Sequence, residues 1–229
     1  MTRWCLLWLW LISSAASATG AVAGRGEAGA ADGVALGCQR LRLVLDTRLD
    51  AAAVARDWAS GVARTERPAV LELRGCRGEL QDKLTLDSPL AQLDAGLLRG
   101  SPAPTVLVAV DLTAEAGTYN GPLTLPIQVI RHRLVPATAR NSAGEIEPIR
   151  LASTGKAAWQ RAPQRRVDDL LFVSCQPRSA GFVTTYRRYH PTKQGWQLQQ
   201  RSEPGLWESD GGFPAASRFP RPRQADPAR

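Results

Sequence analysis

The sequence contains little histidine, lysine or cysteine, and this shortage excludes several classes of protein. Only two of the 229 residues are histidine, His132 and His190, and only four are cysteine. Because no Cys-x-x-Cys pair occurs, we expect no metal site and no bound cofactor. The phosphate-binding loop, the Gly-x-Ser-x-Gly elbow and the His-Glu-x-x-His motif are absent as well. The sequence therefore favours a non-catalytic protein.

Long apolar runs are missing from the chain except at its amino terminus. There a single charge, Arg3, precedes an apolar run over residues 4–12, and small residues follow it to residue 24. This order is typical of a secretory signal peptide. The apolar run is too short for a membrane-spanning helix, which needs about 20 residues. We predict a signal peptide over residues 1–23 that is cleaved after Ala23, with Ala18 as the alternative site.

The signal peptide sets the expected compartment. After it, the most continuous apolar run is residues 106–110, so the mature form is expected to be soluble and to have no transmembrane segment. We predict an extracytoplasmic protein, either periplasmic or secreted. Its length of about 205 residues is enough for a single domain.

Lysine is nearly absent, and arginine supplies almost all of the positive charge. The formal net charge is +8, and removal of residues 1–23 takes away only Arg3, which leaves +7. A basic surface attracts polyanions. Export argues against nucleic acid, so the expected partner is an anionic component of the cell envelope or another protein. The arginines are scattered along the sequence, however, and this fits a charge that only keeps the protein in solution.

Three cysteines stay in the mature chain: Cys38, Cys76 and Cys175. In an oxidising compartment they allow one disulfide and one free thiol, and the sequence leaves all three pairings open. We favour Cys38 with Cys76, because both lie next to strands that are expected to pair. Cys175 ends an apolar strand and is expected in the core or in the bridge.

The mature chain divides into three parts. Residues 24–33 predict a flexible leader, residues 34–212 a single α+β domain, and residues 213–229 an extended tail rich in proline and arginine. Apolar spacing of three or four residues predicts helices over residues 51–64 and 88–100. Residues 154–160 fit either a helical turn or a loop. Alternating or β-branched stretches predict strands over residues 41–45, 69–74, 105–111, 123–130, 134–135, 146–151, 170–175, 182–189, 196–201 and 206–208.

These elements predict an α+β fold with a largely antiparallel sheet. An amino-terminal strand, helix and strand would form one portion of it, and one or two helices would cover one face. The first two strands permit a parallel βαβ unit, and an antiparallel pair with the helix packed across it fits the pattern as well. The last strands are expected to form an antiparallel meander.

A strip of cationic and aromatic residues is the main candidate binding site. It comprises Tyr186, Arg187, Arg188 and Tyr189 of one expected strand, with Trp196 of the next. Arginine offers a forked donor to a phosphate or a sugar acid, and tyrosine offers a flat ring. The alternative is a solvent-facing strand whose tyrosines pack across the sheet. The sequence thus favours an envelope or secreted binding protein of unknown ligand.

Two other functions fit the sequence. A hydrolase of envelope polymers or polysaccharides would need a pair of carboxylates, for which Glu203 and Glu208 are candidates, the latter beside Trp207. Asp168 and Asp169 are less suitable, because adjacent side chains on a strand point to opposite faces. The third hypothesis is a structural subunit of an envelope assembly, which predicts an exposed edge strand or an apolar patch.

Overall fold

The computed structural model describes residues 33–45, 68–111, 119 and 121–222. Several predictions from the sequence fall outside these residues: the signal peptide over 1–23, the leader up to residue 32, the helix over 51–64 and the last seven residues of the tail. None of the described residues forms a helix that is long and apolar enough to cross a membrane.

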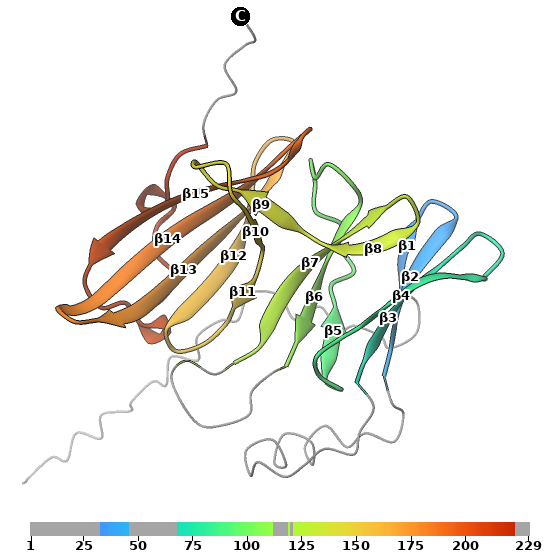
Figure 1. The fold of residues 1–229 in the computed structure, drawn as a ribbon, viewed down its shortest axis with the longest axis horizontal. Coiled ribbons are helices and arrows are strands. Elements are labelled where there is room, and N and C mark those ends of the chain that lie inside the picture. Colours follow the sequence, from blue (N-terminus) through green and yellow to red (C-terminus); the bar gives the residue numbers. More distant parts are fainter. Residues whose placement is uncertain (1–32, 46–67, 112–118, 120, 223–229) are drawn as a thin grey trace, which may run out of the picture.

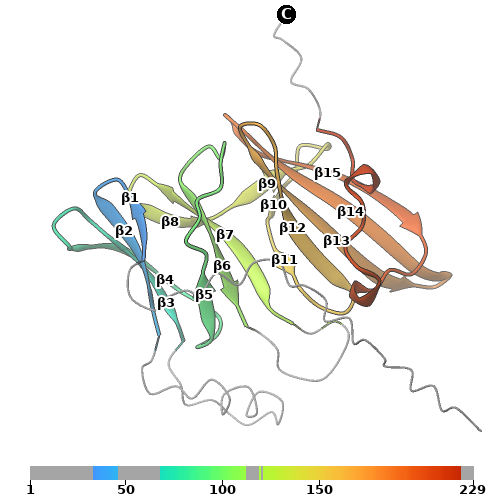
Figure 2. The same ribbon diagram turned by 180° about the vertical axis from the view of Figure 1, so that it is seen from behind.

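Three β-sheets follow one another along the long axis of the molecule (Figures 1 and 2). The amino-terminal sheet has the order β1 (Val34–Leu36), β2 (Gln39–Val44), β3 (Val70–Arg74) and β4 (Leu80–Thr85). The middle sheet has the order β11 (Leu151–Ala152), β7 (Leu123–Ile130), β6 (Thr105–Val110) and β5 (Ala91–Leu93), and β8 (Arg133–Pro136) also pairs with β7. The large carboxy-terminal sheet has the order β10 (Ile146–Pro148), β9 (Thr138–Arg140), β15 (Gly195–Pro204), β14 (Gly181–Thr192), β13 (Asp168–Arg178) and β12 (Ala157–Pro163).

The prediction of an α+β fold is wrong, because the described part of the chain is almost entirely strands and loops. Its only helical elements are two single turns of 3-10 helix, η1 (Ser209–Gly211) and η2 (Ala216–Arg218). The helix expected over 88–100 is replaced by β5 and a loop. Ser88 Oγ does accept a hydrogen bond from the Leu90 amide, as a helix cap would, but Ala91–Leu93 then pairs with β6. Pairing with a distant strand thus overrides the helical spacing of the leucines.

Other predictions for strands are confirmed. The antiparallel meander near the carboxyl terminus exists as β13, β14 and β15, each longer than expected. The first two predicted strands pair antiparallel, as β2 and β3. The undecided segment 154–160 opens with an isolated bridge from Thr154 to Ala157 and continues as β12. Residues 206–208, expected as a final strand, belong to no strand.

The middle sheet is buried on both faces because its central strand β6 alternates between two cores. Val106, Val108 and Val110 point towards the amino-terminal sheet and pack with residues such as Leu41 and Leu71. Leu107, on the opposite face, packs with residues of the large sheet, including Leu170, Tyr189 and Trp196. A strand with apolar side chains on both faces is the expected sequence of a central layer, so the prediction of a buried strand at 105–111 is confirmed.

The outer face of the large sheet is covered by the chain that follows β15. Phe219 lies against Tyr186, with ring centroids 5.5 Å apart in an edge-to-face arrangement, and Phe213 stacks on Phe219. Leu171 and Val173 of β13 complete this third apolar cluster. Residues 213–222, which the sequence assigns to the tail, therefore lie against the sheet.

The chain crosses several times between the middle and large sheets. After β7 and β8 in the middle sheet it forms β9 and β10 in the large one, returns as β11, and then enters β12. At the other end, the disulfide expected between Cys38 and Cys76 is confirmed, with a Cα–Cα distance of 4.7 Å. Cys175 is a free, fully buried thiol.

Candidate functional site

The five residues of the predicted binding strip do not form one surface. Neighbours on β14 alternate between faces, so Tyr186 and Arg188 lie on the outer face of the large sheet, whereas Arg187 and Tyr189 lie on the inner face. Tyr186, Tyr189 and Trp196 are buried, with 3%, 1% and 2% of their surfaces exposed. The aromatic residues of the strip therefore serve the core, and only Arg187 is available to a ligand.

Arg188 is part of a buried network centred on Asp169. Its Nη1 donates to Asp169 Oδ2 at 2.5 Å, and its Nε donates to the Pro220 carbonyl at 2.5 Å. The other oxygen of Asp169 lies 2.7 Å from His190 Nδ1, and Gln164 Nε2 donates to Oδ2 at 2.8 Å. This network holds the segment after β15 on the outer face, so Arg188 has a structural role.

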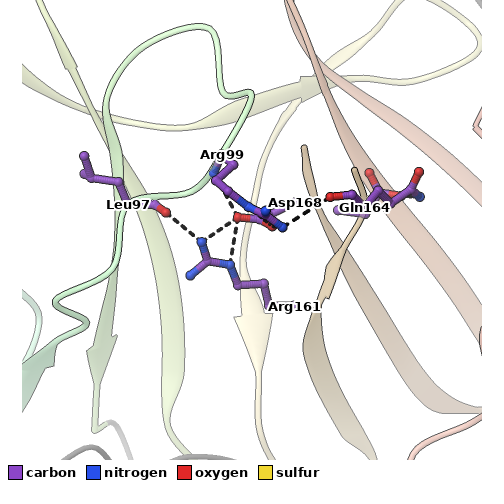
Figure 3. A network of polar contacts seen from close by, with 6 residues as sticks. Leu97, Arg99, Arg161, Gln164 and Asp168 are labelled. Carbon is purple, nitrogen blue, oxygen red and sulfur yellow. Dashed lines mark hydrogen bonds and ion pairs between the residues drawn. The ribbon is translucent and has the colours of Figure 1, made fainter. Parts of the chain in front are cut away.

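Asp168 makes a second network on the inner face (Figure 3). Its fully buried carboxylate accepts hydrogen bonds from Arg99, at 3.0 Å from Nε and 2.8 Å from Nη2, and from Arg161 Nε at 2.9 Å. Arg161 Nη2 also donates to the Leu97 carbonyl at 2.6 Å. Burial alone would raise the pKa of Asp168, but the hydrogen bonds from Arg99 and Arg161 outweigh it and lower the pKa to about 2. The network fixes the loop between β5 and β6 onto β12 and β13.

The carboxylates proposed for a hydrolase are also engaged in ion pairs. Glu203 pairs with Arg218, and Glu208 pairs with Lys156. Trp207 is half-buried, and its Nε1 donates to the Gly212 carbonyl at 3.3 Å. Neither of the two hollows described below has Glu203 or Glu208 in its wall.

A hollow of about 350 Å³ lies between β11 and the inner face of the large sheet, and we call it the arginine hollow. Its volume falls in the range of small-molecule sites. The wall combines cationic, hydroxyl, amide and apolar side chains: Tyr119, Arg150, Ala152, Thr154, Lys156, Ala157, Phe172, Ser174, Gln176, Arg178, Val183, Thr185 and Arg187. Among the residues that the structure describes, no carboxylate belongs to this wall.

The register of β13 and β14 builds the floor of the arginine hollow. Arg187 stands opposite Phe172, Thr185 opposite Ser174, and Val183 opposite Gln176. These positions continue the face that carries Leu170 and Tyr189 in the core, so the inner face changes from apolar to polar where the middle sheet no longer covers it. The polar half of the face is left open to solvent.

The positive charge of the arginine hollow is not neutralised by the part of the chain that the structure describes. Arg150 and Arg178 are exposed and make no ion pair or side-chain hydrogen bond within the described ranges. Arg187 hydrogen-bonds to two neutral side chains: its Nε donates to Gln200 Oε1 at 3.2 Å, and its side chain is also hydrogen-bonded to Tyr189. Lys156 differs, because its ammonium pairs with Glu208 and this hydrogen bond raises its pKa. Three guanidinium groups therefore face the hollow without a carboxylate partner.

A second hollow of about 490 Å³ lies between the amino-terminal and middle sheets. Most residues of its described wall are apolar or glycine, and the ionisable ones are Arg131 and His132. These two form the turn between β7 and β8, where both have positive φ angles of 49° and 64°. His132 Nδ1 accepts a hydrogen bond from Gln39 Nε2 at 2.8 Å, so one of its two ring nitrogens already has a partner. This hollow offers fewer groups to a ligand than the arginine hollow does.

Sequence reasoning identified Arg187 but missed Arg150 and Arg178. A signal for Arg178 exists, because Phe172, Ser174, Gln176 and Arg178 share one face of a long strand and become steadily more polar. No comparable signal marks Arg150, which enters the wall only because β11 returns to the middle sheet.

Comparison with protein-family models, with curated proteins and with solved structures finds no match to this chain.

Proposed function

We propose that this chain is a non-catalytic binding protein of the extracytoplasmic space, and that the arginine hollow holds the anionic groups of its ligand. The observation that carries the proposal is the set of three guanidinium groups, at Arg150, Arg178 and Arg187, that have no carboxylate partner among the described residues. Three arginines elsewhere in the fold, Arg99, Arg161 and Arg188, each bind a buried aspartate. The contrast favours a ligand that supplies the missing negative charge.

The chemistry of the wall supports binding of an anion. Guanidinium groups bind phosphate, sulfate and carboxylate through two parallel hydrogen bonds. The hydroxyl and amide groups of Ser174, Thr185 and Gln176 add neutral donors on the floor between the arginines. Because the described part of the wall contains arginines and no carboxylate, its charge attracts an incoming anion.

The Cys38–Cys76 disulfide supports the proposed compartment, because disulfides persist in oxidising surroundings. Export itself is inferred from residues 1–23, and periplasmic and secreted proteins share both features. The expected ligand is an anionic component of the cell envelope or of the surrounding medium.

Calorimetric titration with tripolyphosphate, a compact probe with several charges, tests the proposal. The wild-type protein should bind the probe at low ionic strength, and the triple variant R150A/R178A/R187A should bind at least about tenfold more weakly, since a single charge-assisted contact contributes about 1.5 kcal/mol or more. Circular dichroism should show that the triple variant keeps its sheets, because Arg150 and Arg178 are exposed and none of the three arginines belongs to an apolar cluster.

The matched control is the triple variant R77A/R165A/R166A. These three arginines are exposed and lie outside the arginine hollow, and their removal lowers the net charge by the same amount. The control should keep wild-type affinity. Equal loss of binding in both triple variants would mean that the probe responds to net charge only, and the proposal would then fail.

A further inference from the structure

We infer that the ligand of the arginine hollow is an extended acidic oligosaccharide rather than a compact anion. The inference rests on the proposed function and adds to it the class of ligand. Its basis is the spacing of Arg187 and Arg178 along the strands and the chemistry of the side chains between them.

The arginines are spread along the hollow. On β14, Arg187 stands opposite Phe172, and on β13, Arg178 stands at the hairpin end opposite Gly181. Positions 172 and 178 are separated by a strand length of roughly 20 Å at about 3.3 Å per residue. A compact anion would require both side chains to bend towards each other over the floor. An oligosaccharide with an acidic group on each of several sugar units can contact both arginines without such a rearrangement.

The floor between the arginines suits a hydroxyl-rich chain. Ser174 and Gln176 lie between positions 172 and 178 on the same face, and Thr185 stands opposite Ser174. Thr185 and Ser202 share a hydrogen bond of 2.9 Å between their hydroxyl groups, which extends the polar row towards β15. Hydroxyl and amide groups pair with sugar hydroxyls in the same way as they pair with one another.

The aromatic content of the wall favours a sugar over a nucleic acid. Single-stranded nucleic acids are bound by several aromatic rings on which successive bases stack. The described wall of the arginine hollow has two aromatic residues, and Phe172 is buried to 94%, which leaves Tyr119 as its exposed ring. One exposed ring beside a row of polar groups fits one sugar face better than a series of stacked bases.

The experiment compares oligogalacturonates of one, two, four and eight units, with affinities measured by calorimetry at constant ionic strength. Affinity should rise at least about tenfold from the monomer to the tetramer. A longer oligosaccharide also binds more tightly for a statistical reason, because it offers more binding positions. The decisive measurement is therefore made with R178A. This variant should weaken binding of the octamer about tenfold and that of the monomer by less than twofold, whereas R165A, with the same loss of charge, should change neither.

Each other outcome overturns the inference in a recognisable way. If R178A and R165A behave alike with the octamer, binding is non-specific. If tripolyphosphate binding depends on the arginines but the octamer binds no tighter than the monomer, the ligand is compact and only the proposed function stands. If neither probe depends on them, both proposals fail. Tighter binding of an eight-nucleotide oligothymidylate than of the octagalacturonate would identify a nucleic-acid site instead.

Discussion

Asp168 and Asp169 are adjacent in the sequence, yet each organises a different side of the large sheet. Asp168 binds Arg99 and Arg161 on the inner face, and Asp169 binds Arg188 and His190 on the outer face. Both carboxylates are completely buried. Because a buried charge is tolerated only with partners, each aspartate ties distant segments of chain to β13.

Replacement of Asp168 by asparagine should lower the free energy of unfolding by about 2 to 3 kcal/mol. The variant keeps the shape of the side chain but removes the charge that binds two guanidinium groups; Arg99 and Arg161 are partly exposed, so water offsets some of the loss. Urea denaturation measures the change. The exposed Asp210 provides the control, and D210N should match the wild type to within about 0.5 kcal/mol.

The stability of the protein should also depend on the ionisation of Asp168. Its pKa is about 2 in the folded state against an ordinary value of 3.8, so its carboxylate stabilises the fold fully above about pH 5, and this contribution is lost as the pH falls from 4 through 2. The shift corresponds to about 2 kcal/mol. The difference in unfolding free energy between wild type and D168N should therefore shrink by that amount between pH 7 and pH 2. A difference that stays constant over this range would contradict the assignment.

At the scale of the elements, the turn between β7 and β8 combines a tight geometry with unsuitable residues. Within the described ranges, Arg131 and His132 are the two non-glycine residues with positive φ. Two-residue hairpin turns of this kind favour Asn-Gly, because these residues tolerate positive φ with little strain. The strained turn lies in the wall of the second hollow, where the side chain of His132 is hydrogen-bonded to Gln39.

The double variant R131N/H132G should raise the free energy of unfolding by about 1 kcal/mol, since relief of backbone strain outweighs the loss of one exposed hydrogen bond. Thermal denaturation checks the sign. The turn at Lys193 and Gln194 joins β14 to β15 in the same two-residue form but with negative φ angles. K193N/Q194G should therefore give no gain, and an equal gain at both turns would refute the explanation by strain.

Local patterns predicted the strands well and the helix poorly. β14 and the first half of β15 alternate between buried and more exposed side chains, whereas β13 begins as a continuous buried run, and both patterns are typical of strands. The spacing of Leu90, Leu93 and Leu97 fits a helix as well as it fits a strand followed by a loop. The strand and loop form because residues 91–93 pair with β6 and because Arg99 binds Asp168, 69 residues away. A contact between residues so far apart in the sequence cannot be predicted from the local pattern of residues.

The candidate site was predicted only in part for the same reason. Charge and aromatic composition drew attention to β14, but they do not indicate which face of the strand is covered. The layer of the middle sheet decides this: it covers Tyr189 and leaves Arg187 at the edge of the arginine hollow. Arg150 joins the wall only through the return of the chain to β11.

At the scale of the whole molecule, the disulfide and the arginine hollow belong to different regions of the chain. The Cys38–Cys76 bridge closes a loop with a sequence separation of 38 and joins the turn after β1 to the loop after β3. Both lie in the amino-terminal sheet, far along the chain from the arginine hollow. The bridge should therefore affect stability and leave ligand binding to the folded protein unchanged.

The double variant C38S/C76S should lower the free energy of unfolding by about 4 kcal/mol, which is the loop-closure entropy of a bridge of this span. Urea denaturation with and without reductant measures it. Reductant should lower the stability of the wild type to that of the variant and should not affect the variant. A wild-type protein that is equally stable under reducing conditions would contradict the expected contribution of the bridge.

The repeated crossing of the chain between the middle and large sheets has a consequence for ligand entry. One wall of the arginine hollow is β11, which pairs with β7, and five residues after Ala152 the chain has already entered β12 of the opposite wall. Two surfaces tied by so short a connection do not separate like the lobes of a hinged protein. We therefore expect a ligand to bind to a preorganised site. The conformational entropy of ordering its walls is lost during folding, so it does not lower the affinity for the ligand.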